Sequence, residues 1–117
     1  MKVLITGANG QLGRELARQS QTFNFEVRAF DHQQLDIADE NSIQQVLAPF
    51  CPAVVINAAA YTQVDRAEAE PDLAYAVNTD GPSYLAQYCA AHHLALIHIS
   101  TDYVFDGTKN QPYQEND

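Results

Sequence analysis

The sequence predicts an α/β fold built on a doubly wound parallel sheet. Four short apolar runs alternate with segments of helical periodicity, and a glycine-rich turn follows the first run. Strands separated by helices pair in parallel through right-handed crossovers. We expect the strand order 3-2-1-4, with ligands at the carboxyl ends of the first and fourth strands, where the order reverses.

The first half of the chain is expected to supply two strands and two helices. Lys2–Thr6 is short, apolar and followed by a glycine, as expected of a buried strand. Apolar residues at helical spacing then predict a helix that ends in the polar run Gln19–Thr22, and Glu26–Phe30 is predicted as the second strand. Asp39 is a suitable N-cap for a second helix, which Pro52 closes.

The second half adds two strands. Ala53–Ile56 is predicted as a buried strand, and Asp65–Glu70 is expected to form one helical turn. One helical face continues across Gly81-Pro82. This predicts either a long helix kinked there or two short ones, because proline cannot donate a backbone hydrogen bond. Leu94–Ile99 is the fourth strand, and the chain after it is typical of a loop.

Length and composition predict one domain and exclude several partners. The 117 residues are 46% hydrophobic, enough to form a core. A net charge of −9 without any basic run argues against nucleic acid and against an anionic membrane surface. No apolar stretch approaches the ~18 residues of a membrane span and no secretory leader is recognisable, so we expect a cytoplasmic protein with Cys51 and Cys89 reduced. No metal site is expected at either cysteine.

The turn Thr6–Gly13 has the spacing G-x-x-G-x-x-G and joins the first strand to the first helix. Gly7 permits the tight turn, Gly10 lets a pyrophosphate approach the backbone N–H groups, and Gly13 lets the helix pack closely on the sheet. In a strand–turn–helix setting this pattern predicts a dinucleotide-binding domain of the Rossmann type over residues 1–117.

Acidic residues after the second strand sharpen this prediction. Asp31 stands at the end of that strand, where a carboxylate can bind the adenosine ribose hydroxyls and favours NADH. Arg14 and Arg28 are near enough to leave NADPH open. Asp36 and Ile37 are suited to the edge and face of the adenine, although polarity at a helix entry is an alternative reading of Asp36.

The segments after the third and fourth strands contain the other candidate residues. The small residues of Asn57–Thr62 let a flat ligand pass close to the backbone, whereas the charges in Val64–Glu68 fit an ordinary helix start equally well. Ser100 and Thr101 follow the fourth strand, where a hydroxyl could hold a substrate carbonyl; a turn that caps the strand is the alternative. His98 is interpreted as a strand side chain and not as a ligand.

Together, Thr6–Gly13, Asn57–Thr62, Val64–Glu68 and Ser100–Gly107 resemble the extended short-chain dehydrogenase/reductase family, in order and spacing over nearly the whole chain. Within it they look like reductases of nucleotide-linked keto sugars. The resemblance implies a parent enzyme that transfers hydride from NADPH or NADH to the C4 ketone of a dTDP-sugar, dTDP-4-dehydro-L-rhamnose. The product, dTDP-L-rhamnose, would serve cell-surface polysaccharide (lipopolysaccharide) synthesis, and the parent could be a homodimer.

The resemblance also assigns residues. Thr101 matches the catalytic Ser or Thr of the family, and with Asp102 and Tyr103 it would lie at the substrate. Related dehydratases carry a Glu where Tyr103 stands, which favours simple ketone reduction here. The cofactor contacts would be made by Gly7, Gly10, Gln11, Leu12, Gly13, Asp31, Asp36, Ile37, Ala58, Ala59, Ala60, Tyr61, Thr62 and Ile99.

One family feature is missing. The family uses a Tyr as proton donor with a Lys four residues later, but no tyrosine here has a Lys at that spacing, and the only lysines are Lys2 and Lys109. We expect this pair, the remaining strands and a substrate lobe to follow Asp117, so that this chain has an incomplete sheet and binds the cofactor without turnover. Two alternatives stay open: a non-catalytic nucleotide-binding regulatory module, and a sister nucleotide-sugar reductase or epimerase.

Overall fold

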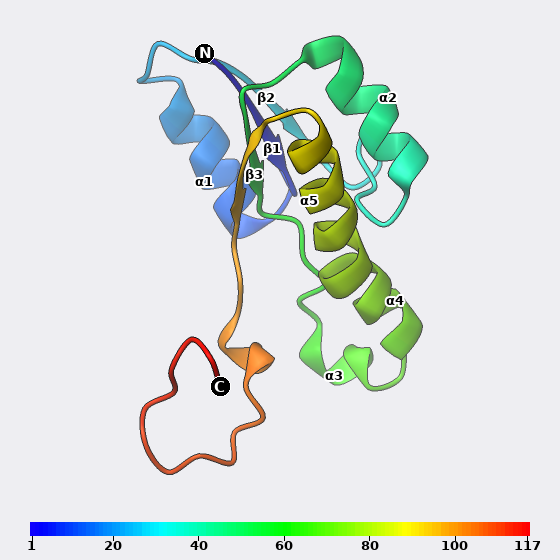
Figure 1. Cartoon of the computed structure of the whole chain (residues 1–117), viewed down its shortest axis with the longest axis vertical. Helices are drawn as coiled ribbons and strands as arrows, with labels where there is room; N and C mark the ends of the chain where they lie inside the picture. Colours follow the sequence, from blue (N-terminus) through cyan, green and yellow to red (C-terminus); the bar gives the residue numbers. More distant parts are fainter.

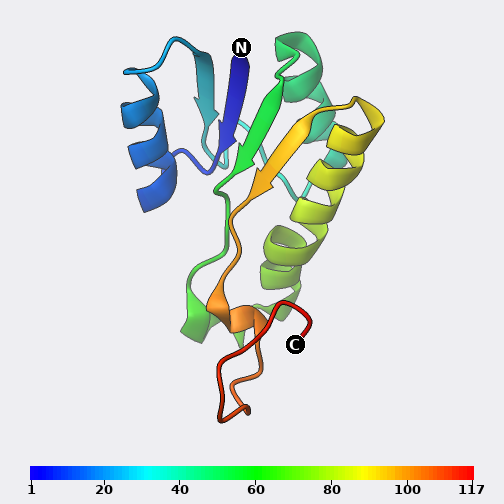
Figure 2. The same cartoon turned by 60° about the vertical axis from the view of Figure 1, so that its left-hand side comes forward.

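The computed structural model describes all residues 1–117 and contains a four-stranded parallel sheet between two layers of helices (Figure 1). Figure 2 shows the four strands side by side, with their carboxyl ends pointing toward the C-terminal segment. In chain order the elements are β1 Lys2–Thr6, α1 Gln11–Ser20, β2 Glu26–Phe30, α2 Glu40–Phe50, β3 Val54–Asn57, α3 Val64–Ala67, α4 Pro71–Tyr75, the π turn η1 Ala76–Asp80, α5 Gly81–Ala91, β4 Ala95–His98 and the 3₁₀ turn η2 Asp102–Val104.

The strand order is β2-β1-β3-β4 and every pair is parallel. The doubly wound α/β class is therefore confirmed, whereas the expected order 3-2-1-4 is wrong. Helices α1 and α2 cover opposite faces of the sheet (Figure 2), and a right-handed crossover on the opposite face moves the chain in the opposite direction. The chain consequently returns past β1 and adds β3 on its other side, so the order reverses between β1 and β3.

The hydrophobic core lies on one face of the sheet, under α2 and α5. It contains residues from β1, β3, both helices and the turn that follows β2. On the other face α1 is the only covering helix, and Ile97 of β4 stays 50% exposed. The buried cluster comprises Leu4, Leu35, Ile37, Ile43, Leu47, Phe50, Val55, Leu85 and Cys89.

The sequence predicted the start of α2 correctly, but not the arrangement at Gly81-Pro82. The side chain of Asp39 accepts a hydrogen bond from the backbone N–H of Asn41, which confirms it as the N-cap of α2. At Gly81-Pro82 the chain forms neither of the two expected arrangements in simple form. Helix α4 runs through the π turn η1 into α5, and the N–H of Gly81 donates to the carbonyl of Ala76, five residues back. A widened turn thus accommodates the proline that follows.

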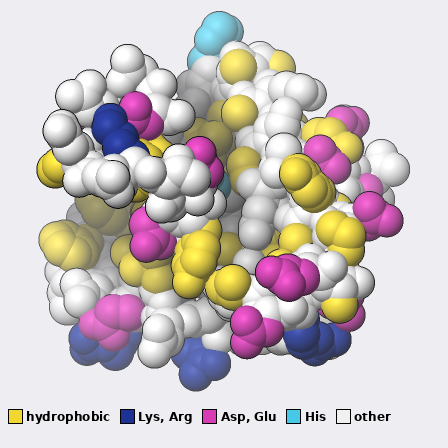
Figure 3. All heavy atoms as spheres, turned by 90° about the horizontal axis from the view of Figure 1, so that it is seen from below, with side chains coloured by type: hydrophobic (Ala, Val, Ile, Leu, Met, Phe, Trp, Pro, Cys, Tyr) yellow, Lys and Arg dark blue, Asp and Glu magenta, His cyan; other side chains and the backbone are white.

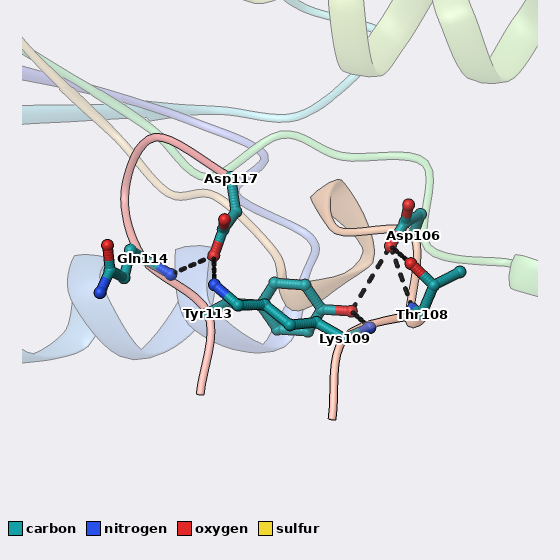
Figure 4. A network of polar contacts seen from close by, with 6 residues as sticks. All are labelled: Asp106, Thr108, Lys109, Tyr113, Gln114 and Asp117. Carbon is teal, nitrogen blue, oxygen red and sulfur yellow. Dashed lines mark hydrogen bonds and ion pairs between the residues drawn. The ribbon is translucent and has the colours of Figure 1, made fainter. Parts of the chain in front are cut away.

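The segment after η2 is irregular, as expected, and is held by contacts of its own (Figure 4). The Phe105 and Tyr113 rings stack with centroids 4.3 Å apart, and the backbone N–H of Lys109 donates to the Tyr113 hydroxyl. Asp106 accepts hydrogen bonds from both the N–H and the hydroxyl of Thr108. None of the helices combines the length and the apolar content needed to cross a membrane.

Candidate functional site

The glycine turn after β1 uses its three glycines differently. Gly7 has a φ of +70°, and a Cβ there would lie 2.6 Å from the carbonyl oxygen of Ala58. A Cβ on Gly13 would overlap the carbonyl oxygen of Gly7. At Gly10 the added atom would meet only that same oxygen, at 3.4 Å. Packing therefore requires Gly7 and Gly13, whereas the missing side chain of Gly10 leaves space open.

The first turn of α1 has free backbone donors. Gly10 is its N-cap and offers no side-chain acceptor, and no acidic residue occupies the first turn. In α2, by contrast, Asp39 fills the capping position. The N–H groups at the start of α1 are thus free to bind an anion, which the helix dipole also favours. The side chains of Gln11 and Leu12 are exposed, and they do not line the hollow described next.

A hollow of about 350 Å³ lies at the carboxyl ends of β1 and β3. This is where the strand order reverses, so the predicted switch point between the first and fourth strands is corrected to β1 and β3. The hollow is lined by Gly7, Asn9, Gly10, His32, Leu35, Asp36, Ile37, Ala58, Ala59, Ala60, Tyr61, Leu73 and Val77.

Asp31 stands beside this hollow without lining it. Its carboxylate accepts hydrogen bonds from the backbone N–H groups of Gln33 and Gln34 and from the side chain of Asn9, and so ties the end of β2 to the glycine turn. Asp36 does line the hollow and also accepts from the backbone N–H of Ala38. Both interpretations of Asp36, ligand contact and helix-entry polarity, are therefore compatible with its position.

A second hollow of about 440 Å³ continues from the first and shares Ala59, Ala60 and Tyr61 with it. Figure 3 looks onto this end of the molecule and shows hydrophobic side chains in and around a recess, with acidic side chains scattered about it. The other residues of the second hollow are Thr62, Val64, Ala67, Asn78, Pro82, His98, Ile99, Ser100, Thr101, Tyr103 and Val104. The two hollows form one trough along the carboxyl ends of β1, β3 and β4.

Thr101 lines the second hollow and also caps η2. Its hydroxyl oxygen accepts from the N–H of Tyr103 at 3.2 Å and donates to the Asp102 carboxylate at 3.3 Å. The predicted turn-capping role is thus present together with the position at the trough. Asp102 does not line the trough, and Tyr103, 72% exposed, stands at its edge.

Known proteins share this arrangement. The family described as the RmlD substrate binding domain matches residues 1–117. The chain belongs to this family. The predicted resemblance to nucleotide-sugar reductases is confirmed at the level of the family.

Individual members are close in sequence and in structure. A dTDP-4-dehydrorhamnose reductase of Aggregatibacter actinomycetemcomitans is 49% identical over 99% of the chain and 40% of its own length. The crystal structure of such a reductase from Clostridium acetobutylicum superposes with a TM-score of 0.92 at 47% identity, over 100% of this chain and 42% of that one. A Bacillus anthracis reductase solved in complex with NADP gives 0.86 at 42% identity, over 93% and 39%. The chain thus spans about 40% of the length of these relatives.

Two side chains that hold Tyr61, a residue of the trough wall, were not predicted from the sequence. Asn78, in the π turn, accepts from the backbone N–H of Tyr61 at 2.8 Å and donates to its carbonyl at 3.0 Å. Glu70 accepts from the Tyr61 hydroxyl at 2.7 Å and from Arg66 at 3.0 Å. The bond to Glu70 raises the pKa of Tyr61, and the bonds from Tyr61 and then Arg66 lower the pKa of Glu70. The sequence offered one weak signal, an asparagine inside an apolar helical segment.

Proposed function

We propose that residues 1–117 form the dinucleotide-binding domain of a reductase that reduces the C4 ketone of dTDP-4-dehydro-L-rhamnose with NADPH or NADH. The observation that carries the proposal is the glycine turn at the β1/β3 reversal, which joins open space at Gly10 to free N–H groups of α1. The similarity to proteins named as dTDP-4-dehydrorhamnose reductases supports the substrate.

The residues present fit a dinucleotide. The backbone N–H groups in the first turn of α1, from Gln11, Leu12 and Gly13, would hold the pyrophosphate in the open space at Gly10. The adenosine would occupy the first hollow beside Asp36 and Ile37, with Asp31 at its rim. The nicotinamide riboside would extend into the second hollow along Ala58–Thr62 and Ile99. Each hollow has a volume in the range of small-molecule sites, and apolar residues predominate in both linings.

NADPH or NADH, when bound, supplies the hydride for ketone reduction. The Thr101 hydroxyl would donate a hydrogen bond to the ketone oxygen, in place of the bond that it now gives Asp102. Asp102 and Tyr103 would border the sugar. The 117 residues contain no Tyr followed four positions later by Lys, so we propose that this chain binds the cofactor without catalysing turnover.

We propose that the protein is located in the cytoplasm. Cys51 and Cys89 are both free thiols, which suits a reducing compartment. We also propose that the full-length parent enzyme is a homodimer.

Calorimetric titration of the chain with NADPH and with NADH tests the function. We expect saturable binding of at least one cofactor, and no NADPH oxidation when dTDP-4-dehydro-L-rhamnose is added. A folded sample that binds neither cofactor would refute the binding role, and sugar-dependent loss of NADPH absorbance would refute the predicted inactivity.

A further inference from the structure

A row of polar side chains crosses the carboxyl ends of three strands. Thr6 of β1 stands opposite Asn57 of β3, and Asn57 stands opposite His98 of β4. Side chains at one register position project from the same face of a sheet. The three therefore form a continuous polar ladder, which we call the Thr6–Asn57–His98 ladder.

Hydrogen bonds fix the orientation of the central amide. The Thr6 hydroxyl donates to Asn57 Oδ1 at 2.6 Å, and the backbone N–H of Ala59 donates to the same oxygen at 3.2 Å. A backbone N–H can only donate, so the atom that it meets must be the amide oxygen. Asn57 is 1% exposed and has no solvent partner to exchange for these contacts.

The orientation of Asn57 determines which ring nitrogen of the neutral His98 carries the proton. Asn57 Nδ2 lies 3.1 Å from His98 Nδ1, and an amide nitrogen acts only as a donor. Nδ1 must then be the unprotonated acceptor, so the neutral ring carries its proton on Nε2. Nε2 makes no hydrogen bond within the chain. The His98 side chain is exposed and lines the second hollow together with Ser100 and Thr101.

We infer that the Thr6–Asn57–His98 ladder sets His98 to present an Nε2–H donor to a neutral acceptor oxygen of the ligand in the second hollow. This inference deepens the proposed function and rests on it. The oxygen could belong to the nicotinamide carboxamide or to the sugar nucleotide. Either group would meet a donor held in place by contacts that begin on β1, on the far side of β3.

The tautomer can be measured before any ligand is added. Long-range ¹H–¹⁵N spectra of the protein with ¹⁵N-labelled histidine distinguish an Nε2–H ring from an Nδ1–H ring. We expect His98 to be Nε2–H, and an Nδ1–H ring would overturn the inference. Asn57→Asp exchanges the donor for an acceptor of the same shape, so in that variant the proton should move to Nδ1.

Titration then identifies the acceptor. A shift of the His98 Nε2–H signal on addition of NADPH assigns the contact to the carboxamide, whereas a shift only on addition of dTDP-L-rhamnose assigns it to the sugar nucleotide. Binding of both ligands without any change at Nε2 would contradict the inference. Failure of NADPH to bind at all would instead count against the proposed function, while the tautomer result would keep its meaning.

A matched pair of variants at the exposed His98 avoids dependence on the buried amide. The amide nitrogen of glutamine can take the place of Nε2, whereas that of asparagine reaches only the place of Nδ1. For the ligand that shifts Nε2, His98→Gln should keep the affinity within about twofold, and His98→Asn should weaken it about tenfold, as expected for one lost hydrogen bond. Equal affinities of the two variants would contradict the donor role.

Discussion

The carboxyl ends of β1 and β3 differ from that of β4 in what holds them. At β1 and β3 the backbone of the glycine turn packs directly on Ala58, and neither Gly7 nor Gly13 has room for a Cβ. Beyond β4 the chain is mostly exposed, with Val104 at 68%, and is held by local side-chain contacts such as the stacking of Phe105 on Tyr113. One end is fixed by backbone packing and the other by a few side chains.

This difference separates two tasks of the proposed enzyme. The side of the trough proposed for the cofactor has a shape that strand pairing and backbone packing define. The side that bears Thr101 depends on short-range hydrogen bonds within an exposed loop. Substitutions in the glycine turn should therefore change folding or cofactor binding. Substitutions in the loop that follows β4 should change local order.

The largest predicted effect is on the free energy of unfolding. It comes from comparing a glycine-to-alanine substitution in the glycine turn with one in the loop beyond β4. Gly13→Ala puts a methyl group into the carbonyl of Gly7 and should destabilise the fold by about 3 kcal/mol or more. Gly107→Ala also meets an unfavourable backbone, with φ of +78°, but nothing lies within 4 Å of the added atom, so it should cost only about 1–2 kcal/mol. Urea unfolding measures both. Equal losses would contradict the contrast between the two ends.

An intermediate effect is expected at Asn78, which bridges the π turn and the wall shared by the two hollows. Asn78→Ala removes both hydrogen bonds to the Tyr61 backbone and should weaken NADPH binding about tenfold. Asn78→Asp keeps the acceptor for the Tyr61 N–H and should lose less. Calorimetric titration of the two variants gives the comparison, and unchanged affinity in the alanine variant would show that the wall needs no such support.

The smallest effect concerns pH and the loop beyond β4. The backbone and side-chain bonds from Thr108 lower the pKa of Asp106 below 3.8, its ordinary value. A carboxyl whose pKa is lowered by folding stabilises the fold above the unfolded pKa, and this contribution disappears as the pH falls through the folded value. We expect the Thr108 amide to lose its protection from exchange below pH 3.8, with Asp106→Asn showing little pH dependence. Hydrogen exchange that is the same in both proteins at every pH would refute this.

The sequence predicted the features that depend on near neighbours. Asp39 caps a helix that begins one residue later, and the glycine spacing over Thr6–Gly13 specifies the strand–turn–helix junction between β1 and α1. The strand order could not be read in this way, because it depends on which face α2 covers, and that follows from packing around Leu35 and Ile37. Periodicity alone does not tell one face of a sheet from the other.

The contacts that the sequence did not predict share one property. Asn78 contacts a residue 17 positions away, and the Asn57–His98 contact spans 41 positions. Such pairs form only once the sheet and the π turn have formed, so no local sequence pattern predicts them. Small residues after a strand were visible from the sequence, whereas the side chains that hold them in place were not.

The central claim is that the open space at Gly10 receives the dinucleotide, and Gly10→Val tests it most directly. The backbone there, with φ of −74° and ψ of 167°, is one that valine adopts readily, and its Cβ would meet only one atom, at 3.4 Å. We predict unfolding free energy within about 1 kcal/mol of the unsubstituted chain. NADPH affinity, measured by calorimetry on the same samples, should fall at least about tenfold. A folded Gly10→Val variant that binds NADPH as tightly as the unsubstituted chain would contradict the account.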